Sequence, residues 1–454
     1  MPASTTGRRP RVALRAAAAV VALGFLAALE ACARHYGLPG PISGQLRELV
    51  APPSSGFLLY AGLALTMVVL TWRERFIAAG AAIGLDLAIA TVRWLAGIEV
   101  TGGHPFGNGA LWVIVGLSVV AVTRRTGRER ALLLKGVGLG LLLVAGRKTG
   151  DTWLLITSKT RPTVLDQYLA TADHALGDPS WLMGRIVTAS GPIGFGLLDI
   201  VYAQLAVAAV CVTLYQLRHV ASARRFPRHH LVRTFLVIGL VGPAVYLVFP
   251  VVGPLYAFST GAEHWASFPL WQQAPSTAHW AVGDLWPHTA PPAGIPHPMP
   301  FDALTPRNCM PSLHTAWAVA IFVHSRGGPR SLRFAGAFWL VATLTATLGF
   351  GMHYGVDLIA GVVFSLTVEA ALRTYDHGWD RSGLALVAYG VTVFTALLLS
   401  YRFLSVQMAA RPAVSGALLV LAMISVIYGY TRTVEAWKPG GVPAPRPEPQ
   451  PELS

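Results

Sequence analysis

Charged side chains are scarce in this sequence. Only 12% of its 454 residues are charged and 54% are hydrophobic, and the mean hydropathy is +0.53. A soluble domain carries about 25% charged residues, so the composition excludes an ordinary soluble protein. Because each bilayer-spanning helix needs about 20 mostly apolar residues, the shortage of charge predicts a chain that crosses a membrane many times.

Cysteine and the common phosphate- and metal-binding motifs are also lacking. Cys32, Cys211 and Cys309 are far apart and form no CxxC pair, which argues against a disulfide framework and a zinc knuckle. We expect each to be a small apolar packing residue. No Gly-rich phosphate loop follows a strand, and no HExxH motif occurs. The sequence therefore predicts neither a metal nor a cofactor.

Long apolar windows predict an all-α, polytopic transmembrane helical bundle of about 12 spans. The predicted spans are 16–34, 56–72, 76–97, 110–123, 131–147, 193–217, 231–252, 311–325, 334–352, 356–372, 383–401 and 412–430. The proline-rich residues 436–454 carry too few apolar side chains to fold, and they predict a disordered tail.

The basic residues indicate which side of the membrane each loop faces. A net charge of +14 would suit nucleic acid, but Lys and Arg fall in short clusters between apolar runs, as the positive-inside rule requires. The clusters are 8–15, 73–75, 124–130, 218–233, 326–333 and 373–381. They share one side if the helices alternate, and 253–306 has no Lys or Arg. We expect a multi-pass plasma-membrane protein with both termini cytoplasmic, 253–310 extracytoplasmic, and no nucleic-acid partner.

Two short strings near the end of the chain carry the candidate chemistry. They are Met310-Pro311-Ser312-Leu313-His314 and His353-Tyr354-Gly355-Val356-Asp357. Each opens a predicted helix that runs inward, and a helical hairpin lies between them. The topology therefore predicts that both histidines reach the same outer surface.

These side chains suit phosphoryl transfer through a histidine. His353 and Asp357 are spaced i,i+4 and share one helix face, so the carboxylate can accept a hydrogen bond from one ring nitrogen and leave the other as a nucleophile. His314 can protonate the departing oxygen. Free N–H groups at both helix starts, with the Ser312 hydroxyl, suit a bound phosphate.

The two strings resemble the second and third signatures of the type 2 phosphatidic acid phosphatase superfamily. Leu313 stands where the phosphatases usually have Gly, and Thr347 stands where the third signature has Arg. Both departures are shared by the inositol phosphorylceramide synthase and sphingomyelin synthase branch, which transfers a phospho-headgroup between lipids. The run from Tyr246 to Tyr256 is also similar to bacterial relatives of that branch. The resemblance covers about 147–373.

The resemblance implies His353 as nucleophile, Asp357 as its partner and His314 as general acid, in a six-helix core with its active site at the outer leaflet. It implies four regions. These are N-terminal transmembrane helices of undefined role over 1–130, the catalytic core over 131–375, C-terminal transmembrane helices over 376–435, and a cytoplasmic tail over 436–454.

The resemblance also implies a metal-independent enzyme that uses membrane lipids as substrates and needs no protein partner. With an alcohol as acceptor it is a lipid phosphotransferase, and inositol phosphate is the headgroup that the branch suggests. With water as acceptor it is a lipid phosphate phosphatase. A non-enzymatic transporter or scaffold is the alternative of another class, but we find no internal repeat of the kind that transporters show.

The cationic clamp on the phosphate is not defined by a motif. The superfamily's first signature, Lys-x6-Arg-Pro, is unmatched, because Leu154 stands seven residues before Arg161. A phosphoryl group needs cationic stabilisation in the transition state. The candidate phosphate-binding residues are Ser312, Arg307, Lys159, Arg161 and, as a weaker choice, Lys148.

Two further features have competing interpretations. The loop 253–306 holds four Trp and four His residues. The histidines could bind a metal, but their spacing fits no zinc pattern. We therefore favour an aromatic lid at the outer interface over a metal site. Asp86, Arg93 and Glu369 lie within predicted spans, where they either serve function or join helices as polar contacts.

Overall fold

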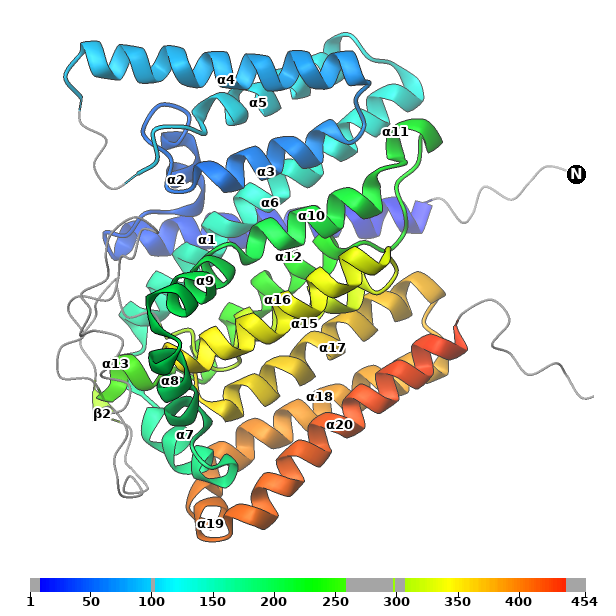
Figure 1. Cartoon of the computed structure of the whole chain (residues 1–454). Helices are drawn as coiled ribbons and strands as arrows, with labels where there is room; N and C mark the ends of the chain where they lie inside the picture. The colour runs from blue at the N-terminus through cyan, green and yellow to red at the C-terminus, as the bar shows by residue number, and fades with distance from the viewer. Residues whose placement is uncertain (1–8, 99–102, 259–296, 299–306, 438–454) are drawn as a thin grey trace, which may run out of the picture.

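The computed structural model describes residues 9–98, 103–258, 297–298 and 307–437 (Figure 1). These residues are almost entirely helical, which confirms the predicted all-α class. Among them, the β structure is one antiparallel pair of two-residue strands, β1 (Thr163–Val164) and β2 (His297–Pro298). Most of the predicted aromatic lid and nearly all of the predicted tail lie outside the described residues.

The N-terminal helices lie together (Figure 1). They are α1 (Arg9–His35), α2 (Pro41–Arg47), α3 (Gly56–Met67), α4 (Trp72–Leu95), α5 (Asn108–Thr123) and α6 (Gly127–Thr160). Helices α3 to α6 share an apolar cluster with residues of α10 (Leu205–Leu217), α11 (Val220–Ala223) and α12 (Leu231–Val248), and α1 packs on α6 in a smaller one. Helices α3 and α6 approach closely at Gly62 and Gly140, where a Cβ on Gly140 would lie 2.4 Å from the Gly62 carbonyl oxygen. Helix α6 also packs against α12, so it joins this group to the rest of the molecule.

Asp86 and Arg93 act as polar contacts inside that group. The buried Asp86 carboxylate accepts hydrogen bonds from the Tyr60 hydroxyl and from the N–H groups of Gly107 and Gly109, each at 2.7 Å. Arg93 donates to the carbonyl of Val50 and to a side-chain oxygen at the start of α5. The bonds on both Asp86 oxygens and the two bonds that tie Arg93 to neighbouring segments favour the structural interpretation of both residues.

The remaining helices surround α17 (Gly355–His377). They are α7 (Asp166–Asp173), η2 (His174–Leu176), α8 (Pro179–Ala189), α9 (Gly191–Ala203), α10 (Leu205–Leu217), α11 (Val220–Ala223), α12, α13 (Pro254–Phe258), α15 (Leu313–Ser325), α16 (Arg330–Gly349), α18 (Arg381–Phe403), α19 (Ser405–Ala410) and α20 (Pro412–Ala436). Helices α7, α12, α15, α18 and α20 all pack on α17. Of the residues in an 18-residue apolar window of α17, 78% are buried, so α17 is the central helix.

Seven described helices are long and apolar enough to cross a membrane. They are α4, the stretch Leu205–Ala223 that combines α10 with α11, α12, α16, α17, α18 and α20. Helices α3, α5, α9 and α15 are shorter apolar helices. The prediction of a polytopic membrane protein is therefore confirmed, whereas the predicted number of spans is not.

Two predicted spans differ from the helices that form. The span predicted over 131–147 belongs to a helix that continues to Thr160, because Lys148 pairs with Glu48 at 2.6 Å and Thr152 bonds the Pro39 carbonyl. These contacts stabilise the extension against α2. The span predicted over 193–217 is divided at Gln204 into α9 and α10.

The two ends of the bundle are distinct (Figure 1). The starts of α15 and α17 lie at the same end as α7, α8, α13 and α19, and the start of α1 and the end of α20 lie at the opposite end. The two strings singled out in the sequence therefore share one end of the molecule, away from both described chain ends.

Candidate active site

Helix α15 begins two residues later than the span predicted from Pro311. The Met310–Pro311 peptide bond is cis, and the helix begins at Leu313 with Ser312 as its N-cap, whose hydroxyl oxygen accepts the Thr315 N–H at 3.3 Å. Capping by a serine side chain is the usual way to satisfy a free N–H at a helix start. His314 therefore lies in the first turn, and Ser312 has a structural task.

The second string is tied to the first through the start of α17. The Ser312 N–H donates to the Asp357 carbonyl at 3.3 Å, and the Tyr354 N–H donates to Asp357 Oδ2 at 2.9 Å. From α8, the Ser180 hydroxyl donates to the His353 carbonyl at 2.6 Å. These bonds fix the backbone on both sides of His353, which positions its ring.

The structure brings His314, His353 and Asp357 together. His353 Nδ1 lies 3.4 Å from Asp357 Oδ2, and the ring centroids of His314 and His353 are 6.4 Å apart. His353 is 4% exposed and Asp357 is fully buried. Burial lowers the pKa of His353 to about 3, because a charged imidazolium loses its hydration there. His353 is therefore neutral near pH 7, with a lone pair on one ring nitrogen.

Cys309 enters this cluster, contrary to its interpretation as a packing residue. Its Sγ donates to Asp357 Oδ2 at 2.6 Å and lies 3.3 Å from His353 Nδ1. Burial, and next the nearby Asp357 and Asp166 carboxylates, raise the pKa of Cys309 well above its usual range, so the group is a thiol. Its position just before the first string was the only signal for this role in the sequence.

Tyr202 of α9 is a second residue that the sequence did not indicate. Its ring stacks on His314 with a centroid distance of 4.1 Å and an angle of 16°. Its hydroxyl lies 3.2 Å from His314 Nδ1. The contact joins α9 to the start of α15 and fixes the orientation of the His314 ring. No motif marks Tyr202, since only the tertiary packing places it there.

The predicted basic residues occupy two environments. Lys159 and Arg161 are exposed at and just after the end of α6, whereas Arg307 is fully buried and donates its Nε–H to the Arg161 carbonyl at 3.3 Å. Lys148 is engaged with Glu48. Thr347, at the position of the superfamily's arginine, donates to the Thr343 carbonyl of its own helix.

Arg147 of α6 is a further cation near the histidines. It lies close enough to His314 for the two side chains to interact electrostatically, and it pairs with Asp151 at 2.8 Å. Arg147 was not among the candidate phosphate-binding residues predicted from the sequence. Its proximity to His314 depends on the packing of α6 against α12 and of α12 against α15.

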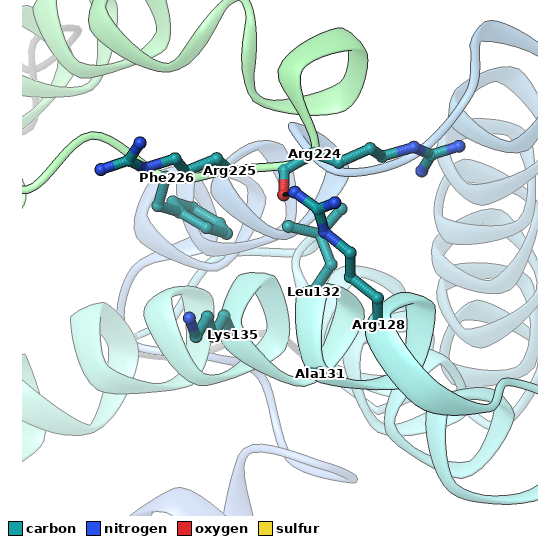
Figure 2. A pocket seen from close by; sticks show the side chains of 7 residues that line it. All are labelled: Arg128, Ala131, Leu132, Lys135, Arg224, Arg225 and Phe226. Atoms are coloured by element: carbon teal, nitrogen blue, oxygen red, sulfur yellow. Dashed lines mark hydrogen bonds between the residues drawn. The ribbon is translucent and has the colours of Figure 1, made fainter. Parts of the chain in front are cut away.

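A cavity of about 320 Å³ lies elsewhere, between the start of α6 and the connection from α11 to α12 (Figure 2). Its lining residues are Arg128, Ala131, Leu132, Lys135, Arg224, Arg225 and Phe226. Two of the basic clusters that the sequence assigns to one membrane side meet there. This end of α6 is far from the starts of α15 and α17 (Figure 1), so the cavity is separate from the histidine cluster.

Comparison with known families divides the chain in two. Residues 167–371 match the PAP2 superfamily, and residues 13–156 match a domain of unknown function, DUF5933. No curated protein and no solved structure matches the chain. The second part of the chain is thus a PAP2 superfamily domain, as its two strings predicted. This domain indicates a lipid enzyme of the phosphatase or phosphotransferase type.

Proposed function

We propose that the protein is an integral membrane phosphotransferase that moves a phospho-headgroup between lipids through a phosphohistidine. The supporting observation is the cluster of His314, His353 and Asp357 at two helix starts joined by a backbone hydrogen bond. The separation of the two rings suits a single phosphoryl group held between them. Both helix N-termini also favour an anion at this place.

In the first step, the free ring nitrogen of His353 attacks the phosphorus of a lipid phosphate or phosphodiester. The N–P bond forms, the bond from phosphorus to the leaving oxygen breaks, and protonated His314 gives its proton to that oxygen. Asp357, whose Oδ2 lies 3.4 Å from His353 Nδ1, stabilises the positive charge that the ring acquires.

In the second step, an acceptor hydroxyl attacks the phosphohistidine. His314, now neutral, takes the proton of the hydroxyl, the new P–O bond forms, and the electron pair of the N–P bond returns to His353. With a lipid alcohol as acceptor the products are a new phospholipid and the original enzyme. With water as acceptor the product is free phosphate or a phosphomonoester, which is the phosphatase alternative.

Two observations favour transfer over hydrolysis. His353 is 4% exposed, so little water reaches the phosphorylated nitrogen. Leu313 and Thr347 depart from the phosphatase pattern, and the Thr347 hydroxyl is bonded within its own helix. We propose inositol phosphate as the headgroup, on the resemblance of these positions to the inositol phosphorylceramide synthase branch.

The phosphate clamp is proposed from the cations around this end of the bundle. Arg307, Lys159 and Arg161 remain candidates, and Arg147 joins them because it lies within electrostatic range of His314. A cation aimed at the phosphoryl oxygens stabilises the charge of the transition state. Ser312 contributes its backbone, since its hydroxyl caps α15.

We further propose that the site faces the extracytoplasmic side of the plasma membrane, with both termini in the cytoplasm. The support is the lack of Lys and Arg in the sequence 253–306, which begins at the end of the bundle that holds the site, where α13 lies (Figure 1). The basic clusters of the sequence favour the opposite side as cytoplasmic. Cysteine labelling with a membrane-impermeant thiol reagent at a residue introduced at Ala257 tests this orientation. We expect the introduced cysteine to be labelled in intact cells. If it is labelled only after lysis, this end of the molecule faces the cytoplasm and the proposed orientation is wrong.

The activity test uses the full-length protein in detergent with a ³²P-labelled lipid phosphate. We expect a base-stable, acid-labile label on the protein and its transfer to an added lipid alcohol. His353→Ala should abolish both, whereas His219→Ala, outside the cluster, should retain them. Labelling that survives in His353→Ala would overturn the mechanism. Rapid phosphate release that is insensitive to added alcohols would establish the phosphatase instead. Turnover should also persist in a chelator, because the proposed steps need no metal.

A further inference from the structure

Three side chains around the candidate nucleophile could act together as metal ligands. Cys309, His353 and Asp357 each offer one ligand atom, and the three atoms lie within 4.8 Å of one another. Sγ is 3.3 Å from Nδ1, and Nδ1 is 3.4 Å from Oδ2. In a tetrahedral zinc site, bonds of about 2.0–2.3 Å place neighbouring ligand atoms roughly 3.3–3.6 Å apart. Two sides of the triangle therefore match before any ion is present.

An unsatisfied carboxylate oxygen points to the missing charge. Asp357 is fully buried, and its Oδ1 has no hydrogen-bond partner among the described residues. Within the described ranges, its ion-pair partner is the ring of His353 at 3.4 Å, and no Lys or Arg side chain pairs with it. A buried carboxylate without a cation is energetically costly, and a divalent cation between the carboxylate, ring and sulfur would remove that cost.

We propose that Cys309, His353 and Asp357 bind a soft divalent cation of the zinc class, and that the bound cation switches off the transferase. Cation binding is argued from the geometry of the three side chains, whereas inhibition also rests on the proposed function. Thiolate and imidazole ligands select zinc and cadmium, while magnesium and calcium prefer all-oxygen sites. A site of this composition therefore discriminates against the abundant hard cations.

Proton balance explains the inhibition. Binding releases the Cys309 thiol proton to solvent and forms the S–metal bond. Metal bonding at His353 Nδ1 uses the lone pair of that nitrogen, so the ring proton moves to Nε2. The nitrogen that attacks phosphorus in the proposed mechanism then carries a proton and has no lone pair to donate. Substrate turnover stops without any change of fold.

The chain supplies a matched internal comparison. His229, His324 and Glu369 form a second group with metal-binding geometry. There, the Leu231 N–H donates to Gln216 Oε1 at 2.9 Å, which turns the amide nitrogen of Gln216 toward His324 Nδ1 at 2.9 Å. His324 Nδ1 is thus an acceptor, and its proton sits on Nε2, facing Glu369. Both oxygens of Glu369 also have hydrogen-bond partners already. The second group therefore lacks the unsatisfied carboxylate oxygen that supports the proposal for the first.

The binding test uses cadmium as a spectroscopic probe on the full-length protein in detergent, after treatment with a chelator and its removal. We expect a thiolate-to-cadmium charge-transfer band that saturates at one ion per chain. Because three cysteines are present, the double variant Cys32→Ser/Cys211→Ser is the matched control, in which Cys309 is the only thiol. The band should persist in this double variant. Its absence there would overturn the proposal without any need for a Cys309 variant.

Single variants then locate the ligands. Cys309→Ser should abolish the band, and Asp357→Asn should weaken zinc binding in equilibrium dialysis by at least about tenfold. Size-exclusion profiles identify variants that fail to fold. A band of unchanged strength in a folded Cys309→Ser protein would overturn the site, because the thiolate would then come from elsewhere.

A turnover measurement separates the two halves of the proposal. Zinc at saturating concentration should inhibit the Cys32→Ser/Cys211→Ser enzyme, and a chelator should restore it. Binding without inhibition would overturn the switch and would contradict His353 as nucleophile. No binding would overturn the site, while the labelling of His353 described above would still decide the proposed function.

Discussion

Two carboxylates of helix α17 each form a cluster with histidines from other segments. The two clusters differ in how fully hydrogen bonds and ion pairs compensate the carboxylate. The first, here the start cluster, consists of Cys309, His353 and Asp357. The second, here the far cluster, consists of His229, His324 and Glu369. Asp357 is fully buried and Glu369 is 1% exposed. The two carboxylates are therefore equally buried, and the comparison shows the effect of their hydrogen-bond and ion-pair partners.

The far cluster satisfies its carboxylate completely. Glu369 Oε1 accepts from His229 at 2.7 Å and from Arg373 at 2.8 Å. Oε2 accepts from Thr234 at 2.6 Å and lies 3.1 Å from His324 Nε2. These donors come from α12 and the loop before it, from α15 and from α17 itself. The far cluster therefore joins several helices, as buried polar contacts in membrane bundles do.

The start cluster leaves its carboxylate half satisfied. Asp357 Oδ1 has no partner among the described residues, and Oδ2 is shared by a thiol, a backbone N–H and a neutral imidazole. Groups buried without full compensation are rare in folded proteins and gather at functional sites. The two carboxylates therefore differ in how completely they are satisfied and not in how deeply they are buried, and on the proposed function the less satisfied one belongs to the reactive cluster.

The strongest test of the difference between the two clusters is to remove one histidine from each. His353→Ala should lower phosphoryl transfer at least about 10³-fold, because the nucleophile is lost. His324→Ala should lower the thermal midpoint and leave the turnover per folded molecule within about twofold, since it touches no reacting atom. Transfer assays on monodisperse protein check both. The distinction fails if His324→Ala loses activity as His353→Ala does.

The next test removes the carboxylate of the far cluster. Glu369→Ala should lower stability by about 3–5 kcal/mol, because it leaves Arg373 and the histidines without their buried partner. Glu435→Ala, an exposed carboxylate on α20, is the control and should change stability by less than about 0.5 kcal/mol. Thermal unfolding in detergent measures the difference. Equal small effects would mean that the far cluster contributes no stability.

A third test concerns the charge near the start cluster. Arg147→Ala should reduce kcat/KM about 100-fold if its guanidinium stabilises the phosphoryl oxygens. Arg161→Ala is the comparison, because the charged groups that interact with His314 include Arg147 and not Arg161, and it should lose less. The kcat/KM values of both variants are measured with the same lipid phosphate. A large loss for Arg161→Ala with none for Arg147→Ala would move the clamp to the end of α6.

The start cluster could be predicted in part from the sequence. The topology of the helical hairpin correctly brought His314 and His353 to the same end. The predicted proximity of His353 and Asp357 is also confirmed, but the predicted shared helix face is wrong, because α17 begins at Gly355 and His353 lies before it. Cys309, Tyr202 and Arg147 could not be predicted, since their positions depend on how other helices and loops pack against those starts.

The same limit applies to the fold and to the far cluster. Apolar windows predicted the bundle, but they could not indicate that α6 would continue to Thr160, which depends on contacts with the α2 region. Glu369 stood out as a charge within a span. Its partners His229 and His324 belong to other segments, and no local pattern links them.

The last expected effect concerns pH. Burial lowers the pKa of His353 to about 3, below the value of about 6.5 for an unfolded histidine. As pH falls from about 6.5 toward 3, the unfolded chain binds a proton that the folded chain does not, so stability falls by about 1.4 kcal/mol per pH unit from this group. Above about pH 6.5 both states are neutral and the effect vanishes.

His353→Gln should therefore flatten the loss of stability on acidification. Thermal midpoints of both proteins, measured at one scan rate from about pH 7.5 to about pH 4, should converge or cross as the pH falls. His230, whose pKa burial lowers to about 4, is the matched control, because His230→Gln should produce the same trend over a narrower range. Parallel curves for His353→Gln and the unaltered protein would show that His353 is charged or solvated in the folded state. The start cluster would then have a satisfied ion pair, and its contrast with the far cluster would disappear.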